Sequence, residues 1–307
     1  MQLTLSLLVV AMAVCLSVSA SAVPSPPNSA VQVYVEYQSI NQGSWTPMTG
    51  PGTVSGTAVA SPDGSLGNQS YAEGLVEFPS SFAGRLGSKS TISGSYPGFD
   101  PPFGLFASAN SYTDSHWTVI SNTLAVGTPV DLVLNAHFDG ALYTGEWFGA
   151  GPGDVYATAS AHWDYYKDNS FGEHFSGDIS LDDNNGVNKS GDWDTYGSWI
   201  SSLGSNENSV SGSVDAPWTI HLTVGEGVRL YMGLSTYCGA VGPYEVMASS
   251  NFSNTGYIQV TGLYDPTTGN RLDASLQGSA VPEPGSLLAL GAGVFGLGGT
   301  LLRRKRV

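Results

Sequence analysis

Apolar and polar residues alternate along most of the chain, and no segment between residues 23 and 280 keeps a helical period. In the segment 31–37, the apolar residues Val31, Val33 and Val35 share one face with Tyr37, and polar residues occupy most of the other. The segments 130–138, 218–224 and 228–234 alternate in the same way. A period of two residues is typical of β-strands that bury one face. The pattern therefore predicts a β-rich body with almost no helix.

Clusters of Gly, Asn, Asp, Ser and Pro separate these segments and predict turns. Asp139-Gly140 predicts a hairpin between the strand 130–138 and a return strand 141–147. Gly225-Glu226-Gly227 predicts a turn into the strand 228–234, and further strands are expected over 154–163 and around 258–260. Many short strands with such turns are typical of an antiparallel β-sandwich. We expect a jelly-roll-like pair of sheets rather than a closed barrel.

Two stretches lack regular alternation. The segment 171–204 is rich in Asp, Asn and Gly, and we interpret it as a long decorated loop or an insertion between strands. The segment 266–280 is polar and is expected to be a flexible linker. These assignments leave residues 23–265 as the β-sandwich ectodomain, a length that one all-β domain can fill.

The N-terminal residues 1–22 have the character of a secretion signal. An apolar run over residues 3–18 is followed by Ala20-Ser21-Ala22, which fits a cleavage site between small residues. The sequence therefore predicts an exported protein.

The C-terminal residues 281–307 combine a short motif, an apolar span and a basic end. Pro282-Glu283-Pro284 is followed by the uncharged segment 285–302. As a helix this segment would extend over ~27 Å, close to the ~30 Å of a bilayer core. The closing basic cluster would stay in the cytoplasm, which predicts that the body lies outside the inner membrane.

This arrangement resembles the PEP-CTERM sorting signal of bacterial surface proteins. The matching residues are Val281, Pro282, Glu283 and Pro284 before the span, and Arg303, Arg304, Lys305 and Arg306 after it. The resemblance implies an exosortase as partner, a transient anchor in the inner membrane, and delivery to the cell envelope, the surface or the extracellular matrix. It also implies a host that makes exopolysaccharide or biofilm matrix.

Charged residues are sparse and mostly acidic. They make up 11% of the chain, which has a net charge of −15. Loss of the tail with its four basic residues leaves six basic against 25 acidic residues, a net charge of −19 if Glu283 is retained. Such a surface repels phosphate backbones, so no nucleic-acid partner is expected.

A compact run of oxygen-bearing side chains is the candidate metal site. Asp182, Asp183, Asn184 and Asn185 offer the hard ligands that Ca²⁺ prefers. The run does not fit the EF-hand spacing, because Leu181 would fall at the first ligand position. The alternative interpretation is a solvated turn, and no other cofactor is expected.

Sequence motifs for catalysis are lacking. The five histidines show no H-x-H or H-E-x-x-H spacing, and no G-x-S-x-G is present. Asp164 and Glu173 could act as an acid–base pair, although any acidic chain supplies such pairs. Cys15 lies in the predicted signal peptide, which leaves Cys238 as an expected buried thiol. We expect a protein that is not an enzyme.

Tryptophan and tyrosine are abundant, and their role divides the remaining hypotheses. Trp163, Trp193 and Trp199 are candidates for stacking on sugar rings, and the alternative is that they pack in the core. The favoured hypothesis is a non-catalytic structural or adhesive protein associated with exopolysaccharide. A carbohydrate-binding β-sandwich module is the second hypothesis, and a secreted hydrolase is the third.

Overall fold

The computed structural model divides the chain into two compact units, Met1–Ser25 with Gly278–Val307, and Pro26–Gln277. The predicted signal peptide and sorting signal lie outside the described residues. Within the described residues, no helix is both long enough and apolar enough to cross a bilayer. The structure describes residues 28–37, 40–49, 52–61, 69–78, 83–95, 105–147, 154–167, 170–182, 185–204, 207–241 and 245–278.

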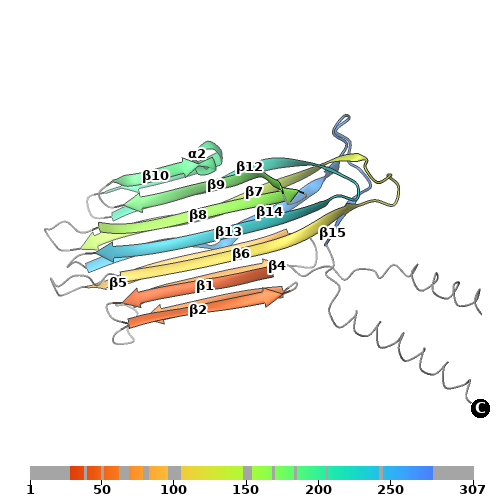
Figure 1. Cartoon of the computed structure of the whole chain (residues 1–307). Helices are drawn as coiled ribbons and strands as arrows, with labels where there is room; N and C mark the ends of the chain where they lie inside the picture. The colour runs from red at the N-terminus through yellow and green to blue at the C-terminus, as the bar shows by residue number, and fades with distance from the viewer. Residues whose placement is uncertain are drawn as a thin grey trace, which may run out of the picture. The chain divides into compact units, whose positions relative to one another are not determined.

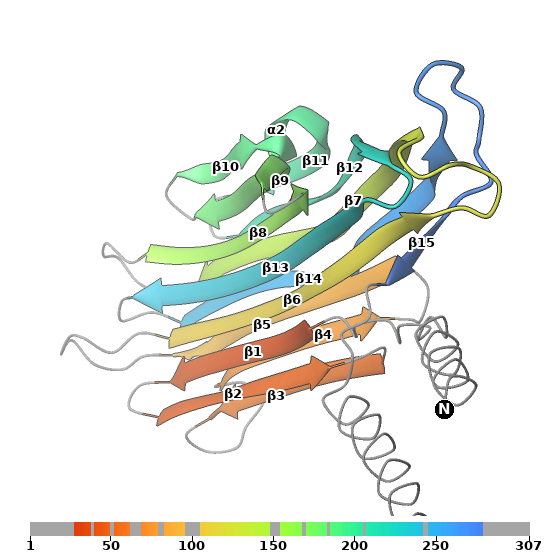
Figure 2. The same ribbon diagram turned by 45° about the vertical axis from the view of Figure 1, so that its right-hand side comes forward.

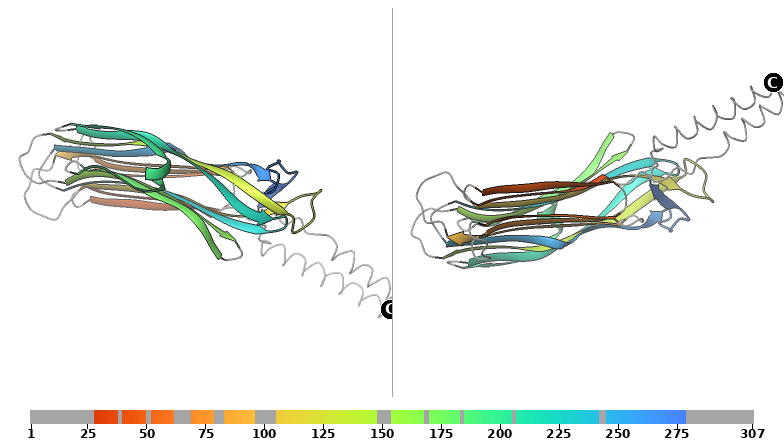
Figure 3. Two further views of the ribbon diagram at one scale, coloured as in Figure 1. Left: turned by 90° about the horizontal axis from the view of Figure 1, so that it is seen from above. Right: turned by 90° about the horizontal axis from the view of Figure 1, so that it is seen from below.

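The described part of the second unit consists of two antiparallel sheets stacked face to face (Figure 1 and Figure 3). Sheet 1 has the strand order β10 (Gly186–Gly191), β9 (Ser170–Asp182), β8 (Asp154–Lys167), β13 (Gly227–Val241), β6 (Leu105–Ile120), β1 (Asn28–Tyr37), β2 (Ile40–Thr49), with β15 (Ser275–Gly278) also paired to β6. Sheet 2 has the order β11 (Gly197–Leu203), β12 (Glu207–Thr223), β7 (Pro129–Trp147), β14 (Glu245–Tyr264), β5 (Ala83–Ser95), β4 (Gln69–Phe78), β3 (Gly52–Ala60).

The strands that alternate in the sequence bury the predicted faces. Val31, Val33 and Val35 of β1 point into the core, and so do the alternate residues of β7 from Val130 to Phe138. Ile220 and Leu222 of β12 are buried in the same way. The prediction of an all-β antiparallel sandwich is confirmed, while the jelly-roll-like connection of its strands stays a prediction.

The predicted hairpin at Asp139-Gly140 is wrong, because β7 continues through both residues. Gly140 pairs with Gly212 of β12 in an uninterrupted register. Its φ lies outside the left-handed region that such a turn requires. The glycine serves a close approach instead, since a Cβ built at Gly140 would lie 2.5 Å from the ring of Phe252 on β14. The missing side chain makes room for an aromatic ring and does not turn the chain.

The segment 171–204, interpreted from the sequence as a long decorated loop or an insertion between strands, consists mostly of strands. It holds most of β9, all of β10, the one-turn helix α2 (Asp192–Tyr196) and β11. Phe175, Ile179 and Leu181 of β9 are buried, which is a strand period that the surrounding Asp and Gly residues obscure in the sequence. In Figure 2, α2 lies between β10 and β11, so it links the edge strand of sheet 1 to the edge strand of sheet 2.

The described part of the predicted linker, residues 266–278, forms a turn and a strand instead. The Gly269 amide donates to the Asp265 carbonyl at 2.8 Å, and the Leu272 amide donates to the Leu263 carbonyl at 2.8 Å. Leu272 and Leu276 pack partly buried against the core. These apolar contacts and the pairing of β15 with β6 give the segment a place in the sandwich.

Where β5 of sheet 2 faces β6 and β13 of sheet 1, the core is made of small residues and hydroxyl groups. The buried Ser88 hydroxyl donates to the Ala109 carbonyl at 2.6 Å and lies 3.0 Å from the Thr236 hydroxyl. In the opposite direction, the Ser111 hydroxyl donates to the Gly87 carbonyl at 2.7 Å. A serine side chain reaches the backbone of the facing sheet only where the sheets are close together, so these bonds hold the two layers near each other.

Where β8 and β9 face β7 and β12, aromatic side chains fill the space between the sheets. They form a continuous series of ring contacts: Tyr165 with Trp218, Trp218 with Trp163, Trp163 with Phe175, Phe175 with Phe138, Phe138 with Trp193, and Trp193 with Trp199 and Phe252. The sandwich therefore has a close-packed serine-rich region and a wider aromatic region.

Candidate functional site

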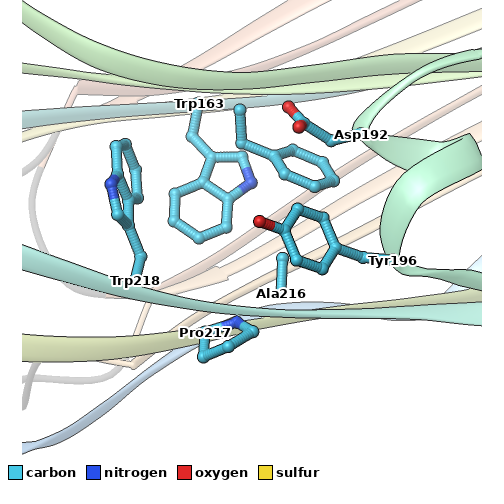
Figure 4. Close-up of a pocket in the computed structure, with 7 residues that line it drawn as sticks. Trp163, Asp192, Tyr196, Ala216, Pro217 and Trp218 are labelled. Atoms are coloured by element: carbon cyan, nitrogen blue, oxygen red, sulfur yellow. The ribbon is translucent and has the colours of Figure 1, made fainter.

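A pocket opens in the aromatic region, between β8 and β9 of sheet 1 and β12 of sheet 2, beside α2 (Figure 4). Its volume is about 380 Å³, which lies within the range of ~300–1,000 Å³ typical of small-molecule sites. We call it the aromatic pocket. Its lining residues are Trp163, Phe175, Asp192, Tyr196, Ala216, Pro217 and Trp218.

Three buried side chains line the aromatic pocket most deeply. Trp163 of β8 is 1% exposed and Phe175 of β9 is 5% exposed, and their ring centroids lie 5.4 Å apart. Ala216 of β12 comes from the facing sheet and is also buried. Because Ala216 carries only a methyl group, the space opposite the two rings is left unfilled.

More exposed side chains surround this base. Trp218 is half-buried and packs edge-on against Trp163, with centroids 4.7 Å apart and an interplanar angle of 63°. Tyr165 also contacts the Trp218 ring edge-on, with centroids 5.3 Å apart. Tyr196, on α2, is 45% exposed, and its hydroxyl is turned toward the Trp163 ring in Figure 4. The pocket thus offers aromatic surface at its base and along its rim.

Polar groups are few in the aromatic pocket, and one of them lacks a partner. The Trp163 indole Nε1–H is buried and has no hydrogen-bond acceptor. The Asp192 carboxylate accepts a hydrogen bond from the Ser176 amide at 2.9 Å, which fixes its position beside the pocket. A buried donor without an acceptor costs free energy of about 1–3 kcal/mol. An oxygen atom of a ligand could recover that cost.

The structure separates the three tryptophans that the sequence singled out. Trp163 lines the aromatic pocket. Trp193 is fully buried and stacks on the half-buried Trp199, with centroids 5.4 Å apart and planes 11° from parallel. The Trp199 indole donates to the Trp193 carbonyl at 3.4 Å, so this pair packs α2 onto the sandwich and does not line the pocket.

Sequence reasoning missed the other pocket residues. Trp218 was expected only as one of the core-facing residues of its strand, and it does share their face. Phe175, Asp192 and Tyr196 fall in the segment 171–204, which the sequence marks as a decorated loop or an insertion between strands. One signal could have identified β9 and, with it, one wall of the pocket. It is the two-residue spacing that places the apolar residues Phe175, Ile179 and Leu181 on one face of a strand.

The described residues provide no contact that supports the calcium hypothesis. Asp182 closes the turn between β9 and β10, where its carboxylate accepts from the Asn185 amide at 2.9 Å and from the Asn185 side chain at 3.2 Å. Asp183 and Asn184 lie outside the described residues. Within the described residues, no group of three or more His, Cys, Asp or Glu side chains is arranged to hold a metal ion. Calcium binding stays a prediction.

The histidines that can be placed pair with carboxylates or stack on rings. On the outer face of sheet 2, His137 lies 2.7 Å from Asp215, and His221 lies 2.6 Å from Asp131. His162 stacks on Tyr231 across the outer face of sheet 1 at 5.2 Å. None of them lines the aromatic pocket.

The remaining candidates for chemistry lie elsewhere. Asp164 is on the outer face of β8, opposite to Trp163, and the side chain of Glu173 lies outside the description. Cys238 is fully buried, as predicted, and its thiol donates to the Ser90 carbonyl at 3.2 Å. Burial raises the pKa of the Cys238 thiol far above its ordinary value, so its thiolate is scarce.

Comparison with known protein families identifies the tail. Residues 280–306 match the family described as PEP-CTERM protein-sorting motif, as the sequence predicted. PEP-CTERM signals are processed by exosortases, so the chain is an exported protein sorted at the membrane by such an enzyme and destined for the cell surface. No curated protein matches the chain.

A structure of infectious bursal disease virus Gx strain is among the solved structures compared. It shares 9% sequence identity with this chain over 89% of this chain and 74% of the viral one, with a TM-score of 0.10. A TM-score that low carries no argument about fold or function.

Proposed function

Because the tail is a PEP-CTERM sorting motif, we propose that the chain is a non-catalytic structural or adhesive protein of the cell envelope or extracellular matrix, associated with exopolysaccharide. The sorting motif is the observation that carries this proposal, since it directs the folded body to the outside of the cell. The sandwich suits that role, because two long sheets with a continuous core present broad outer faces.

The pocket chemistry favours binding over hydrolysis. Glycoside hydrolases use two carboxyl groups that flank the scissile bond, about 5–9.5 Å apart. The described lining of the aromatic pocket contains one carboxylate, Asp192. This supports a carbohydrate-binding module as the second candidate function, and the hydrolase hypothesis gains no comparable support.

The test compares surface delivery with matrix cohesion in a bacterium that carries an exosortase. Replacing Pro282, Glu283 and Pro284 by Ala should leave the protein uncut and retained in the inner membrane. Biofilm cohesion should then fall to the level of a strain without the protein. Pro266→Ala, which changes an exposed proline outside the motif, is the control and should behave as wild type.

Catalysis is tested separately. The surface-released protein, incubated with the exopolysaccharide of the host, should produce no new reducing ends and no shortening of the polymer. Release of oligosaccharides at a rate proportional to protein concentration would overturn the proposal. The proposal would also be overturned if the strain without the protein formed biofilm as cohesive as that of the wild-type strain.

A further inference from the structure

We propose that the aromatic pocket binds one uncharged sugar ring, presented by a neutral polysaccharide. The inference rests on the proposed function and deepens it, because it names the ligand class and the residues that recognise it. It stands on three features of the pocket: an unsatisfied buried donor, aromatic walls, and an acidic rim.

The unsatisfied donor is the Nε1–H group of Trp163. This residue is 1% exposed, lines the pocket, and finds no acceptor for its indole hydrogen. Buried polar groups in folded proteins nearly always have partners, so an exception at a pocket wall indicates a missing acceptor. A sugar hydroxyl or ring oxygen is such an acceptor.

The aromatic walls suit the C–H faces of a sugar ring. Phe175 and Trp163 form the base, and Trp218 stands at a steep angle to Trp163. A ligand in this corner meets ring surface on more than one side. Tyr165 also packs edge-on against Trp218, with ring centroids 5.3 Å apart, and this second ring contact limits the movement of the wall before a ligand arrives.

The rim adds hydrogen bonds and selects against negative charge. The Tyr196 hydroxyl can donate or accept, and the Asp192 carboxylate can accept hydrogen bonds from sugar hydroxyls. No Lys or Arg is found among the described residues that line the pocket. Together with the acidic net charge of the chain, this arrangement disfavours uronic acids and other anionic sugars.

The size of the pocket is sufficient for a sugar ring. A volume of 380 Å³ corresponds to about a dozen water molecules at about 30 Å³ each. That space accommodates a single sugar ring, with neighbouring residues of the polymer outside. Ala216 keeps this space open, because its methyl group is the smallest side chain on the wall opposite Trp163.

The test is isothermal titration calorimetry with the full chain in a detergent that contains no sugar. The probes are glucose, galactose, mannose and N-acetylglucosamine, with glucuronic acid as the charged comparison. At least one neutral sugar should bind, and glucuronic acid should bind at least tenfold more weakly. Trp218→Ala removes a wall and should weaken binding of that sugar tenfold or more.

A second variant and a control locate the site. Ala216→Leu keeps every aromatic side chain and narrows the pocket, so it should weaken binding tenfold or more while the melting temperature stays near that of wild type. Trp45→Ala removes a tryptophan that is 61% exposed on β2, outside the pocket lining, and should bind as wild type. If Trp218→Ala fails to fold, Tyr196→Phe takes its place, with a weaker but measurable loss of affinity.

The inference is overturned if none of the neutral sugars binds, if glucuronic acid binds as tightly, or if Trp218→Ala and Ala216→Leu bind as wild type. These results leave the proposed function intact, because surface delivery and biofilm cohesion are measured with the tail variants and without a sugar ligand. A failure of those assays would equally leave the calorimetric result standing.

Discussion

Gly140 makes the sharpest test of the packing between β7 and β14. A Cβ at this position would lie 2.5 Å and 2.6 Å from two ring carbons of Phe252, which is 1% exposed and also contacts Trp193 and Trp199. The ring cannot move away freely, so Gly140→Ala should overpack the core at a cost of about 1–3 kcal/mol. Loss of chain entropy in the unfolded state offsets about 0.4–1 kcal/mol of that. The net destabilisation should be about 1–2 kcal/mol.

The measurement is thermal unfolding of the full chain followed by near-ultraviolet circular dichroism. For a domain of this size, 1 kcal/mol shifts the melting temperature by about 2–4 °C, so Gly140→Ala should melt roughly 2–8 °C below wild type. Gly227→Ala is the matched control, because the nearest heavy atom to its Cβ would be 3.7 Å away. It should leave the melting temperature almost unchanged.

A double-mutant cycle separates close packing from a backbone requirement for glycine. In a Phe252→Leu background the smaller side chain leaves room for a methyl group at position 140. Gly140→Ala should then be neutral or slightly stabilising, with a coupling energy of about 0.5–3 kcal/mol. If Gly140→Ala costs the same in both backgrounds, the glycine is needed for its backbone conformation and the packing argument is wrong.

Three further predictions follow from the serine-rich region, the buried thiol and the acidic turn. Ser88→Ala removes a buried hydroxyl that bonds the facing sheet, and it should cost about 1 kcal/mol in chemical denaturation, whereas the exposed Ser55→Ala should cost nothing measurable. The Cys238 thiol should resist Ellman's reagent in the folded protein even at pH 9, because burial raises its pKa and keeps it protonated. It should react fully in guanidinium, and rapid reaction of the folded protein would contradict the prediction. Millimolar CaCl₂ should raise the melting temperature more than NaCl of matched ionic strength. This difference between the salts should be smaller in the variant with both Asp182→Ala and Asp183→Ala, and equal shifts with the two salts would exclude a specific site.

The class of fold could be predicted because strand alternation is a local property. Val31, Val33 and Val35 show their common face within a few residues of sequence, and the structure buries that face. Turn signals are local too, but they are weaker. Asp139-Gly140 has the composition of a hairpin turn, yet both residues pair with β12 in a continuous strand. The glycine is needed because the Phe252 ring, more than a hundred residues away in sequence, occupies the space beside it.

The sorting tail depends on contiguous residues, whereas the pocket in the body depends on residues that are distant in sequence. Pro282-Glu283-Pro284, the apolar span and the basic end are contiguous, so the sequence alone determined the sorting signal, and the family comparison confirms it. The sequence likewise determined the antiparallel strands and the inward direction of Trp218. The aromatic pocket was decided only by the tertiary structure. Its walls come from β8, β9, α2 and β12, whose positions are set by strand pairing and by the crossing of α2 between the sheets. Alternation shows which face of a strand is buried, but it does not show which strand lies opposite, and a pocket depends on what lies opposite.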